Sequence, residues 1–164
     1  MKYASSQNLG YLLIKSSRAW NQRLMEIFKS KGYDDLKPSF GAVFIPLFDK
    51  DNQNITDIMN FSNLSKQSMT VYINELKGRG YIETRHNPDD RRFVRVLLTP
   101  KGKVLKTVAD EVVKQVNYEF SQQLRASEFK ELLQILNKIS ENVNGRARFS
   151  PDKKSNKIVV PDDC

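Results

Sequence analysis

The chain is 164 residues long, close to one ordinary domain, and hydrophobic residues make up 39% of it. Its formal net charge of +8 and pI near 9.6 point first to a polyanionic partner, most commonly nucleic acid, although a basic balance can also serve solubility alone. The single cysteine, Cys164, cannot form an internal disulfide, which favours an intracellular protein. The N-terminus has no apolar signal core, and no stretch approaches the ~18 consecutive apolar residues of a membrane span. We therefore expect a cytoplasmic protein.

Two helices are predicted in the N-terminal quarter of the chain. Apolar residues at helical spacing indicate a helix over residues 8–31, with Asn8 as its cap and Gly32 as the left-handed residue that ends it. A second helix follows Pro38, and Pro46 inside it predicts a kink or an early end. The polar residues 49–54 are expected to form a loop.

Two short helices follow, separated by a tight turn. The first covers residues 55–62 and stops at Asn63, which tolerates the left-handed conformation. The second is capped by Ser65 and runs to Lys77 or Arg79. Its predicted core stripe has the i, i+3, i+4, i+7 spacing and consists of Met69, Tyr72, Ile73 and Leu76.

After residue 80 the apolar period changes from that of a helix to that of a strand. Residues 81–86 and 93–98 are predicted strands of a hairpin, joined by the charged turn 87–92. A long helix then begins at Thr99 and Pro100, and Ser127 is expected to cap a last helix that ends at Gly145. Residues 146–164 suggest a mobile tail.

Two short helices followed by a hairpin is the element order of a winged helix-turn-helix. The predicted fold class is therefore mainly α with a small β-wing. In such proteins the second short helix lies in the major groove of duplex DNA, with its N-terminal residues on base edges. A helical wheel turns its core stripe inward and leaves as candidate DNA-contacting residues Gln67, Thr70, Val71 and Asn74, flanked near the cap by Ser65, Lys66 and Ser68. These residues can also be read as the solvated face of an ordinary amphipathic helix.

Charge placement favours the DNA-binding interpretation. Residues 65–103 contain nine basic and four acidic residues, a net charge of +5, whereas residues 104–145 contain five basic and six acidic residues. Charged residues that served only solubility would be spread evenly along the chain and would not be concentrated in residues 65–103. The basic candidates on the predicted hairpin are Arg85, Arg91 and Arg92.

The run ELKGRGYIETRHNPDDRRFVRVLLTPKGK resembles the signature of the MarR (multiple antibiotic resistance regulator) family. The matching parts are Leu76, Gly80, the Asp90-Arg91-Arg92 wing tip, Leu98-Thr99 and Gly102. The opening LSKQSM of the second short helix is also similar to the family, and the helix order matches over about residues 8–145.

The resemblance implies a homodimer that binds double-stranded DNA as a transcription regulator, most often a repressor on a pseudo-palindromic operator. Residues 8–145 would be a single unit, in which 36–99 form the winged helix-turn-helix and 8–35 with 100–145 supply dimerisation helices. The resemblance further implies that Arg92 enters the minor groove and that Asp90 orients it. A narrow A·T-rich minor groove favours an arginine. Val71 departs from the family pattern, in which several relatives have a longer polar side chain, so base specificity cannot be transferred. Pro46 is a second departure, which is expected to alter the angle of its helix against the dimer helices.

Many members of this family bind a small aromatic or phenolic effector in a cleft. Trp20, Phe40 and Phe44 are candidates to line such a cleft, although aromatic residues at helical spacing are also typical of a core. No cofactor or metal site is predicted.

An enzyme is not expected. The only histidine, His86, lies on a predicted strand, and the only cysteine lies in the tail, so a nucleophilic triad and a zinc site both lack residues. The alternative is a winged helix that contacts another protein, as an anti-repressor does, without affinity for DNA. Retention of Lys66, Arg91 and Arg92 argues against that alternative.

Overall fold

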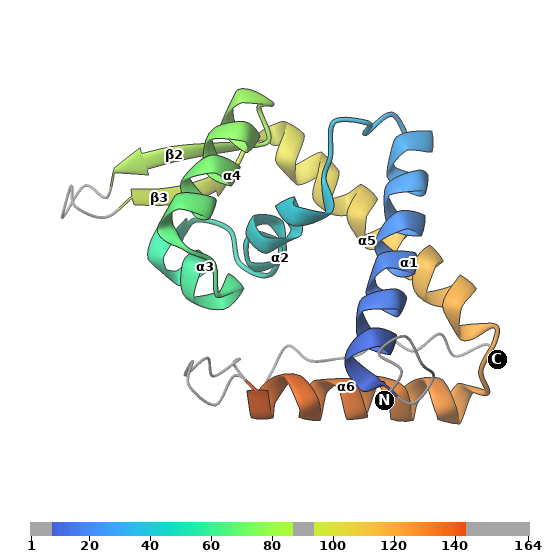
Figure 1. Cartoon of the computed structure of the whole chain (residues 1–164). Helices are drawn as coiled ribbons and strands as arrows, with labels where there is room; N and C mark the ends of the chain where they lie inside the picture. The colour runs from blue at the N-terminus through green and yellow to red at the C-terminus, as the bar shows by residue number, and fades with distance from the viewer. Residues whose placement is uncertain (1–7, 87–93, 144–164) are drawn as a thin grey trace. The chain divides into compact units, whose positions relative to one another are not determined.

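The computed structural model describes residues 8–86 and 94–143. Within them the fold is mainly helical with a small β-hairpin, as predicted, and the hairpin belongs to an antiparallel sheet with a third strand (Figure 1). The chain divides into two compact units, residues 1–116 and 117–164. None of the helices in the described part of the chain is long and apolar enough to cross a membrane.

Helix α1 (Leu9–Ser30) begins and ends where the sequence predicts. The Asn8 side chain accepts a hydrogen bond from the Tyr11 backbone N–H at 3.1 Å, which caps the helix. Gly32 adopts a φ of +86° just beyond its end. Only Ile27 and Phe28 of this helix are buried, whereas residues 9–19 are all exposed. The N-terminal half of α1 therefore has apolar side chains that nothing in its own unit covers.

A short 3-10 turn, η1 (Pro38–Phe40), leads into α2 (Gly41–Asp49). Pro46 lies inside α2, and the helix continues for three residues beyond it. Proline has no N–H to donate to the carbonyl of Ala42, four residues earlier. The hydroxyl of Ser62, at the end of the next helix, donates to that carbonyl instead. This tertiary hydrogen bond replaces the one that Pro46 cannot make.

The next two helices form the predicted pair joined by a tight turn. Helix α3 (Ile55–Ser62) ends at Asn63, which has a φ of +50°. Helix α4 (Lys66–Gly78) is capped by Ser65, whose Oγ accepts a hydrogen bond from the Ser68 N–H at 3.2 Å. The cap and the turn both agree with the prediction.

The sheet consists of β1 (Gln53–Asn54), β2 (Ile82–His86) and β3 (Val94–Leu98) in the order β1-β3-β2. The predicted hairpin is confirmed, with Ile82 opposite Leu98 and His86 opposite Val94. The prediction of a loop over residues 49–54 is wrong in part, because Gln53 pairs with Val96 in β3. Two polar residues carry no strand periodicity, and only the unpaired edge of β3 makes them a strand.

Helix α5 (Pro100–Ser121) starts at the predicted Thr99-Pro100 pair, where the Gly102 N–H donates to Thr99 Oγ1 at 3.2 Å. Gly102 fits this position because a Cβ there would overlap the Tyr81 carbonyl oxygen and lie 3.1 Å from Leu98 Cδ2. The first turn of α5 thus packs directly on the backbone at the start of β2.

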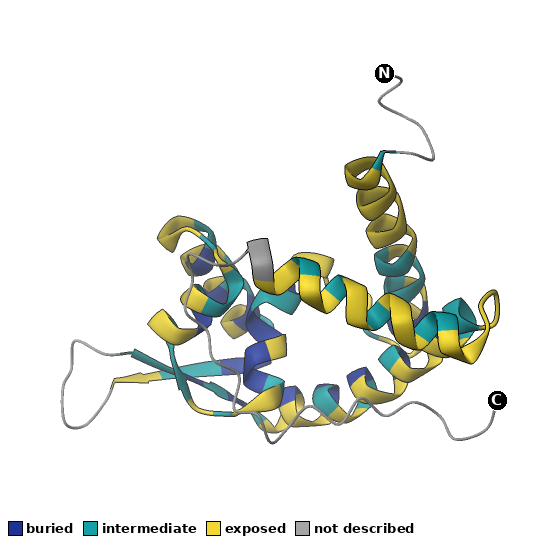
Figure 2. Cartoon of the chain, turned by 90° about the horizontal axis from the view of Figure 1, so that it is seen from below, coloured by how far each residue is buried: buried dark blue, intermediate teal, exposed yellow. Residues whose placement is uncertain are grey.

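The core of the first unit lies where α2, α3, α4, the sheet and the first part of α5 meet (Figure 2). Its largest fully buried side chains are Tyr81, Phe40, Leu47, Ile58, Met69, Leu76, Leu105, Val43, Val96, Val112 and Val116. This packing places α4 and the strands β2 and β3 on a common core with α2 and the first part of α5.

The second unit contains the end of α5 and helix α6 (Ala126–Val143). The prediction that Ser127 caps this helix is wrong, because the helix already begins at Ala126 and Glu128 accepts a hydrogen bond from the Arg125 N–H at 2.9 Å. The helix has apolar residues at helical spacing, yet Leu132 and Ile135 remain 40% and 45% exposed. Gly145 and residues 146–164 lie outside the described residues.

Candidate nucleic-acid interface

Helix α4 has one face in the core and one face open to solvent. Met69, Ile73 and Leu76 are buried, in agreement with the predicted stripe, while Tyr72 is half-buried. The positions predicted to face outward are exposed, namely Lys66, Gln67, Thr70, Val71 and Asn74. The burial of the opposite face therefore fixes which residues of α4 a partner can reach.

Hydrogen bonds at the first turn of α4 separate structural side chains from available ones. The Ser65 hydroxyl accepts from the Ser68 N–H and donates to Ser68 Oγ at 3.0 Å. The Thr70 hydroxyl donates to the Lys66 carbonyl at 2.8 Å. Ser65 and Ser68 thus hold the helix start, and the N-terminus of α4 still offers its first backbone N–H groups to an anion.

The predicted wing residues are described only in part. Arg85 lies on β2, is exposed, and forms an ion pair with Glu83. Asp90, Arg91 and Arg92 lie between β2 and β3, outside the described residues. On β3, half-buried Arg95 donates to the Asn52 carbonyl at 3.3 Å, which ties the hairpin to the turn before β1. Figure 1 shows β2 and β3 running side by side away from the helices.

The C-terminal end of α4 is fixed by a charged cluster that periodicity did not reveal. The Lys37 ammonium lies 2.6 Å from a Glu75 carboxylate oxygen, and Arg79 lies 3.4 Å from the same oxygen. The hydrogen bond from Lys37 lowers the pKa of Glu75. Asp35 accepts a hydrogen bond from the Tyr81 hydroxyl at 2.8 Å. These contacts join the end of α4 and the start of β2 to the segment that follows α1. Their partners lie 38 and 46 residues apart in the sequence, so no local pattern predicts them.

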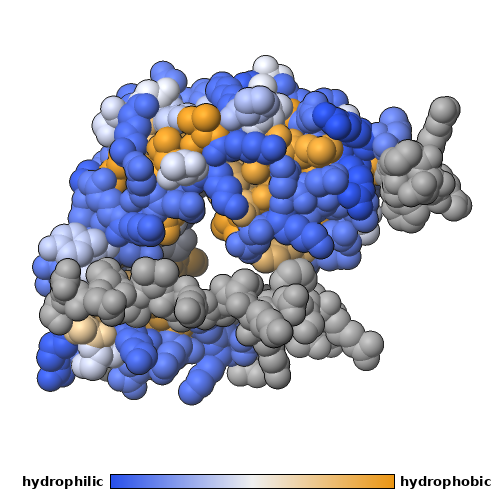
Figure 3. Space-filling view, turned by 180° about the vertical axis from the view of Figure 1, so that it is seen from behind, coloured by the Kyte–Doolittle hydropathy of each residue, from blue (hydrophilic) through white to orange (hydrophobic). Residues whose placement is uncertain are grey.

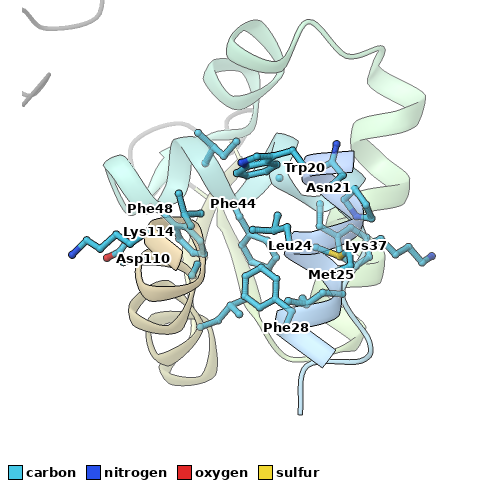
Figure 4. A pocket seen from close by; sticks show the side chains of 18 residues that line it. Trp20, Asn21, Leu24, Met25, Phe28, Lys37, Phe44, Phe48, Asp110 and Lys114 are labelled. Carbon is cyan, nitrogen blue, oxygen red and sulfur yellow. The ribbon is translucent and has the colours of Figure 1, made fainter. Parts of the chain in front are cut away.

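The first unit also contains a cavity of about 460 Å³, and the three residues predicted to line an effector cleft, Trp20, Phe40 and Phe44, all line it. Figure 4 shows the Trp20 indole and the Phe44 ring facing it beside Leu24 and Phe28, while the ammonium groups of Lys37 and Lys114 extend outward. The cavity is therefore mainly apolar and aromatic, with charged groups at its rim.

Two cavity-lining rings contact the elements that carry the interface. Phe40 meets Tyr72 of α4 edge-on, with ring centroids 6.3 Å apart. Phe44 meets Tyr81, at the start of β2, edge-on at 5.8 Å. Burial raises the pKa of Tyr81, and its hydrogen bond to Asp35 acts in the same direction. A displacement of the Phe40 or Phe44 ring would therefore change a contact with α4 or with the residue before β2.

The described residues offer no group of three or more His, Cys, Asp or Glu side chains that could hold a metal ion. The chemistry available at the α4 face is hydrogen bonding by amides, contact by methyl groups and attraction of anions.

Comparisons with known proteins agree with this geometry. The model of the MarR family matches residues 43–94, which include α3, α4 and β2. The HTH-type transcriptional regulator SarZ of Staphylococcus saprophyticus is 33% identical over 72 residues, which cover 43% of this chain and 49% of the relative. The matched segment thus spans about half the length of that curated relative.

Two solved structures are similar in fold. One is a mutant of MarR from E. coli complexed with operator DNA, with a TM-score of 0.73, 20% identity, and coverage of 85% of this chain and 98% of that one. The other is the transcriptional repressor CouR bound to a DNA duplex, with a TM-score of 0.74, 22% identity, and coverage of 85% and 98%. At these identities the likeness establishes the winged helix-turn-helix fold.

Proposed function

We propose that this chain is a MarR-family transcriptional regulator that binds double-stranded DNA sequence-specifically as a homodimer; the family model matches residues 43–94, within its winged helix-turn-helix. The observation that carries this proposal is the exposed face of α4, which begins with Lys66 and presents the amides of Gln67 and Asn74 opposite a stripe buried in the core. SarZ is named as a transcriptional regulator, and this name supports the prediction that the chain is not an enzyme.

In this proposal α4 enters the major groove and the hairpin follows the adjacent backbone. Gln67 and Asn74 hydrogen-bond to base edges, and Lys66 contacts guanine or a phosphate. Arg92 enters the minor groove, with Asp90 holding its side chain. Ser65 and Ser68 position the helix N-terminus, which receives a phosphate. Arg85 and Arg91 add phosphate contacts along the hairpin.

The homodimer is supported by apolar surface that each unit leaves uncovered. Leu9 and Ile14 of α1 are 59% and 55% exposed, and α6 contains no buried residue among those whose side chains are described. Figure 3 shows apolar surface gathered between hydrophilic areas. An amphipathic helix gains most of its stability by burying its apolar face. We assign residues 8–35 and 100–145 to dimerisation, with 36–99 as the DNA-binding part and 146–164 as a tail.

We further assign the cavity to a small aromatic or phenolic effector that releases a repressor from its operator. The rings of Trp20, Phe40 and Phe44 suit a flat apolar ligand. The edge-on contacts of Phe40 with Tyr72 and of Phe44 with Tyr81 give such a ligand a direct route to α4 and the hairpin.

The test is equilibrium binding to a duplex selected from a random pool, followed by fluorescence anisotropy at several salt concentrations. A dimer that covers ~6–8 phosphates should give a slope of log K against log[salt] of about −5 to −7. The selected DNA should contain two inverted half-sites about one helical turn apart. A slope near zero, half-sites in direct repeat, or tight binding by a stable monomer would contradict the proposal.

A further inference from the structure

An apolar side chain lies in the middle of the exposed polar face of α4. Val71 is 52% exposed, and its neighbours on that face, Gln67 one turn before and Asn74 one turn after, are also exposed. Valine is a poor choice for a solvated helix position, because its β-branch restricts its rotamers and no burial compensates. Neither the core nor helix propensity therefore accounts for Val71.

The residue before it, Thr70, adds a further methyl group to the same face. Thr70 is exposed, and its hydroxyl donates its proton to the Lys66 carbonyl of its own helix at 2.8 Å. An external partner can therefore take from Thr70 only an acceptor contact or contact with its methyl group. At positions 70 and 71 a partner therefore meets methyl groups and no free hydrogen-bond donor from a side chain.

Duplex DNA offers one apolar group in the major groove, the 5-methyl group of thymine. The amides at positions 67 and 74 complement adenine, which presents N6 and N7 in the same groove. Arginine is the side chain that most often reads guanine, and it is absent from the four outward positions 67, 70, 71 and 74. The chemistry of positions 67, 70, 71 and 74 is thus that of A·T pairs, whereas Lys66, which precedes them, can reach guanine or a phosphate.

We infer that Val71, assisted by the methyl group of Thr70, determines specificity by contacting thymine 5-methyl groups in the centre of each half-site. This inference rests on the proposed function, because it assumes that α4 lies in the major groove. It goes beyond that function by naming the chemical group that is read and the residue that reads it.

The experiment uses the duplex selected by the full chain, in which thymines are replaced by uracil one position at a time. Uracil keeps the base pair and removes only the methyl group. Binding is measured by fluorescence anisotropy at constant salt. The wild-type protein should lose about fourfold in affinity at one or two symmetry-related positions, the effect of one buried methyl group. Val71→Ala should bind the thymine duplex more weakly and show no further loss with uracil at those positions.

Two variants serve as controls. Val71→Thr keeps the shape of the side chain but replaces one methyl group by a hydroxyl, so the thymine preference should shrink. Gln67→Ala should weaken binding elsewhere in the half-site and leave the response to uracil at the Val71 position unchanged. Because position 71 is exposed, none of these changes should unfold the domain, which circular dichroism can verify.

The outcomes separate this inference from the proposed function. Salt-dependent binding that responds to uracil at no position, or a Val71→Ala variant that keeps the full thymine preference, overturns the role of Val71 and leaves the DNA-binding function standing. A protein that binds no selected duplex overturns both.

Discussion

Gly102 allows the sharpest test of how the DNA-binding core is assembled. It lies in the first turn of α5, where a Cβ would overlap the Tyr81 carbonyl oxygen and approach the Tyr81 carbonyl carbon to 3.3 Å. That oxygen cannot retreat freely, because it accepts a hydrogen bond from the Thr99 N–H at 3.1 Å; the Thr99 hydroxyl, whose closer acceptor is the Gly80 carbonyl at 2.6 Å, also lies 3.1 Å from it. Gly102→Ala should therefore force α5 away from the start of β2.

The expected change in the free energy of unfolding is the sum of one stabilising and two destabilising contributions. Alanine in a helix gains about 1 kcal/mol over glycine. Overpacking against atoms that cannot move typically costs about 1–3 kcal/mol. Weakening the hydrogen bond from the Thr99 N–H to the Tyr81 carbonyl costs about 0.5–1.5 kcal/mol. The expected net effect is a loss of about 2 kcal/mol in the free energy of unfolding, opposite in sign to helix propensity alone.

Urea unfolding of the full chain, followed by circular dichroism at one fixed protein concentration, measures this loss. If the free energy of unfolding decreases by about 2 kcal/mol per molar urea, this loss lowers the urea concentration at the unfolding midpoint by about 1 M. Gly78→Ala is the matched control, because Gly78 ends α4 and has no neighbour within 4 Å of an added Cβ. It should be neutral or stabilising by up to about 1 kcal/mol. If Gly102→Ala is as stable as Gly78→Ala, the packing argument is refuted.

Two further predictions concern the wing and the cavity. Asp90→Ala removes a negative charge beside the proposed DNA site and by Coulomb's law alone should tighten binding. If Asp90 orients Arg92 as the proposed function assigns, the variant should instead bind more weakly in anisotropy assays. Tighter binding would show that the wing acts only as a diffuse positive patch. Trp20 is the only tryptophan and lines the cavity, so titration with simple phenols should change its fluorescence and lower affinity for the operator in parallel. Phe40→Leu should weaken both responses together, and a fluorescence change without any effect on DNA binding would separate the cavity from regulation.

Local sequence was sufficient for most features whose signals are short-range; the exception is the start of α6, where the helix begins at Ala126 and not after a Ser127 cap. Asn8 and Ser65 cap their helices through hydrogen bonds to residues three positions away. Gly32 and Asn63 end theirs with a positive φ, and the alternation on either side of residues 87–93 predicted the hairpin. The exposed face of α4 could be predicted for the same reason, since a fixed period of 3.6 residues determines which side chains oppose a buried stripe.

Tertiary structure decided whatever depends on partners far apart in the chain. Gln53 becomes a strand only because β3 offers an unpaired edge some 43 residues later. Pro46 stays inside a helix because Ser62 donates to the carbonyl it leaves free. The cavity collects side chains from α1, α2 and α5, and Lys37 reaches Glu75 over 38 residues. A propensity or a period describes one segment at a time, whereas these contacts arise only when separate segments are packed against one another.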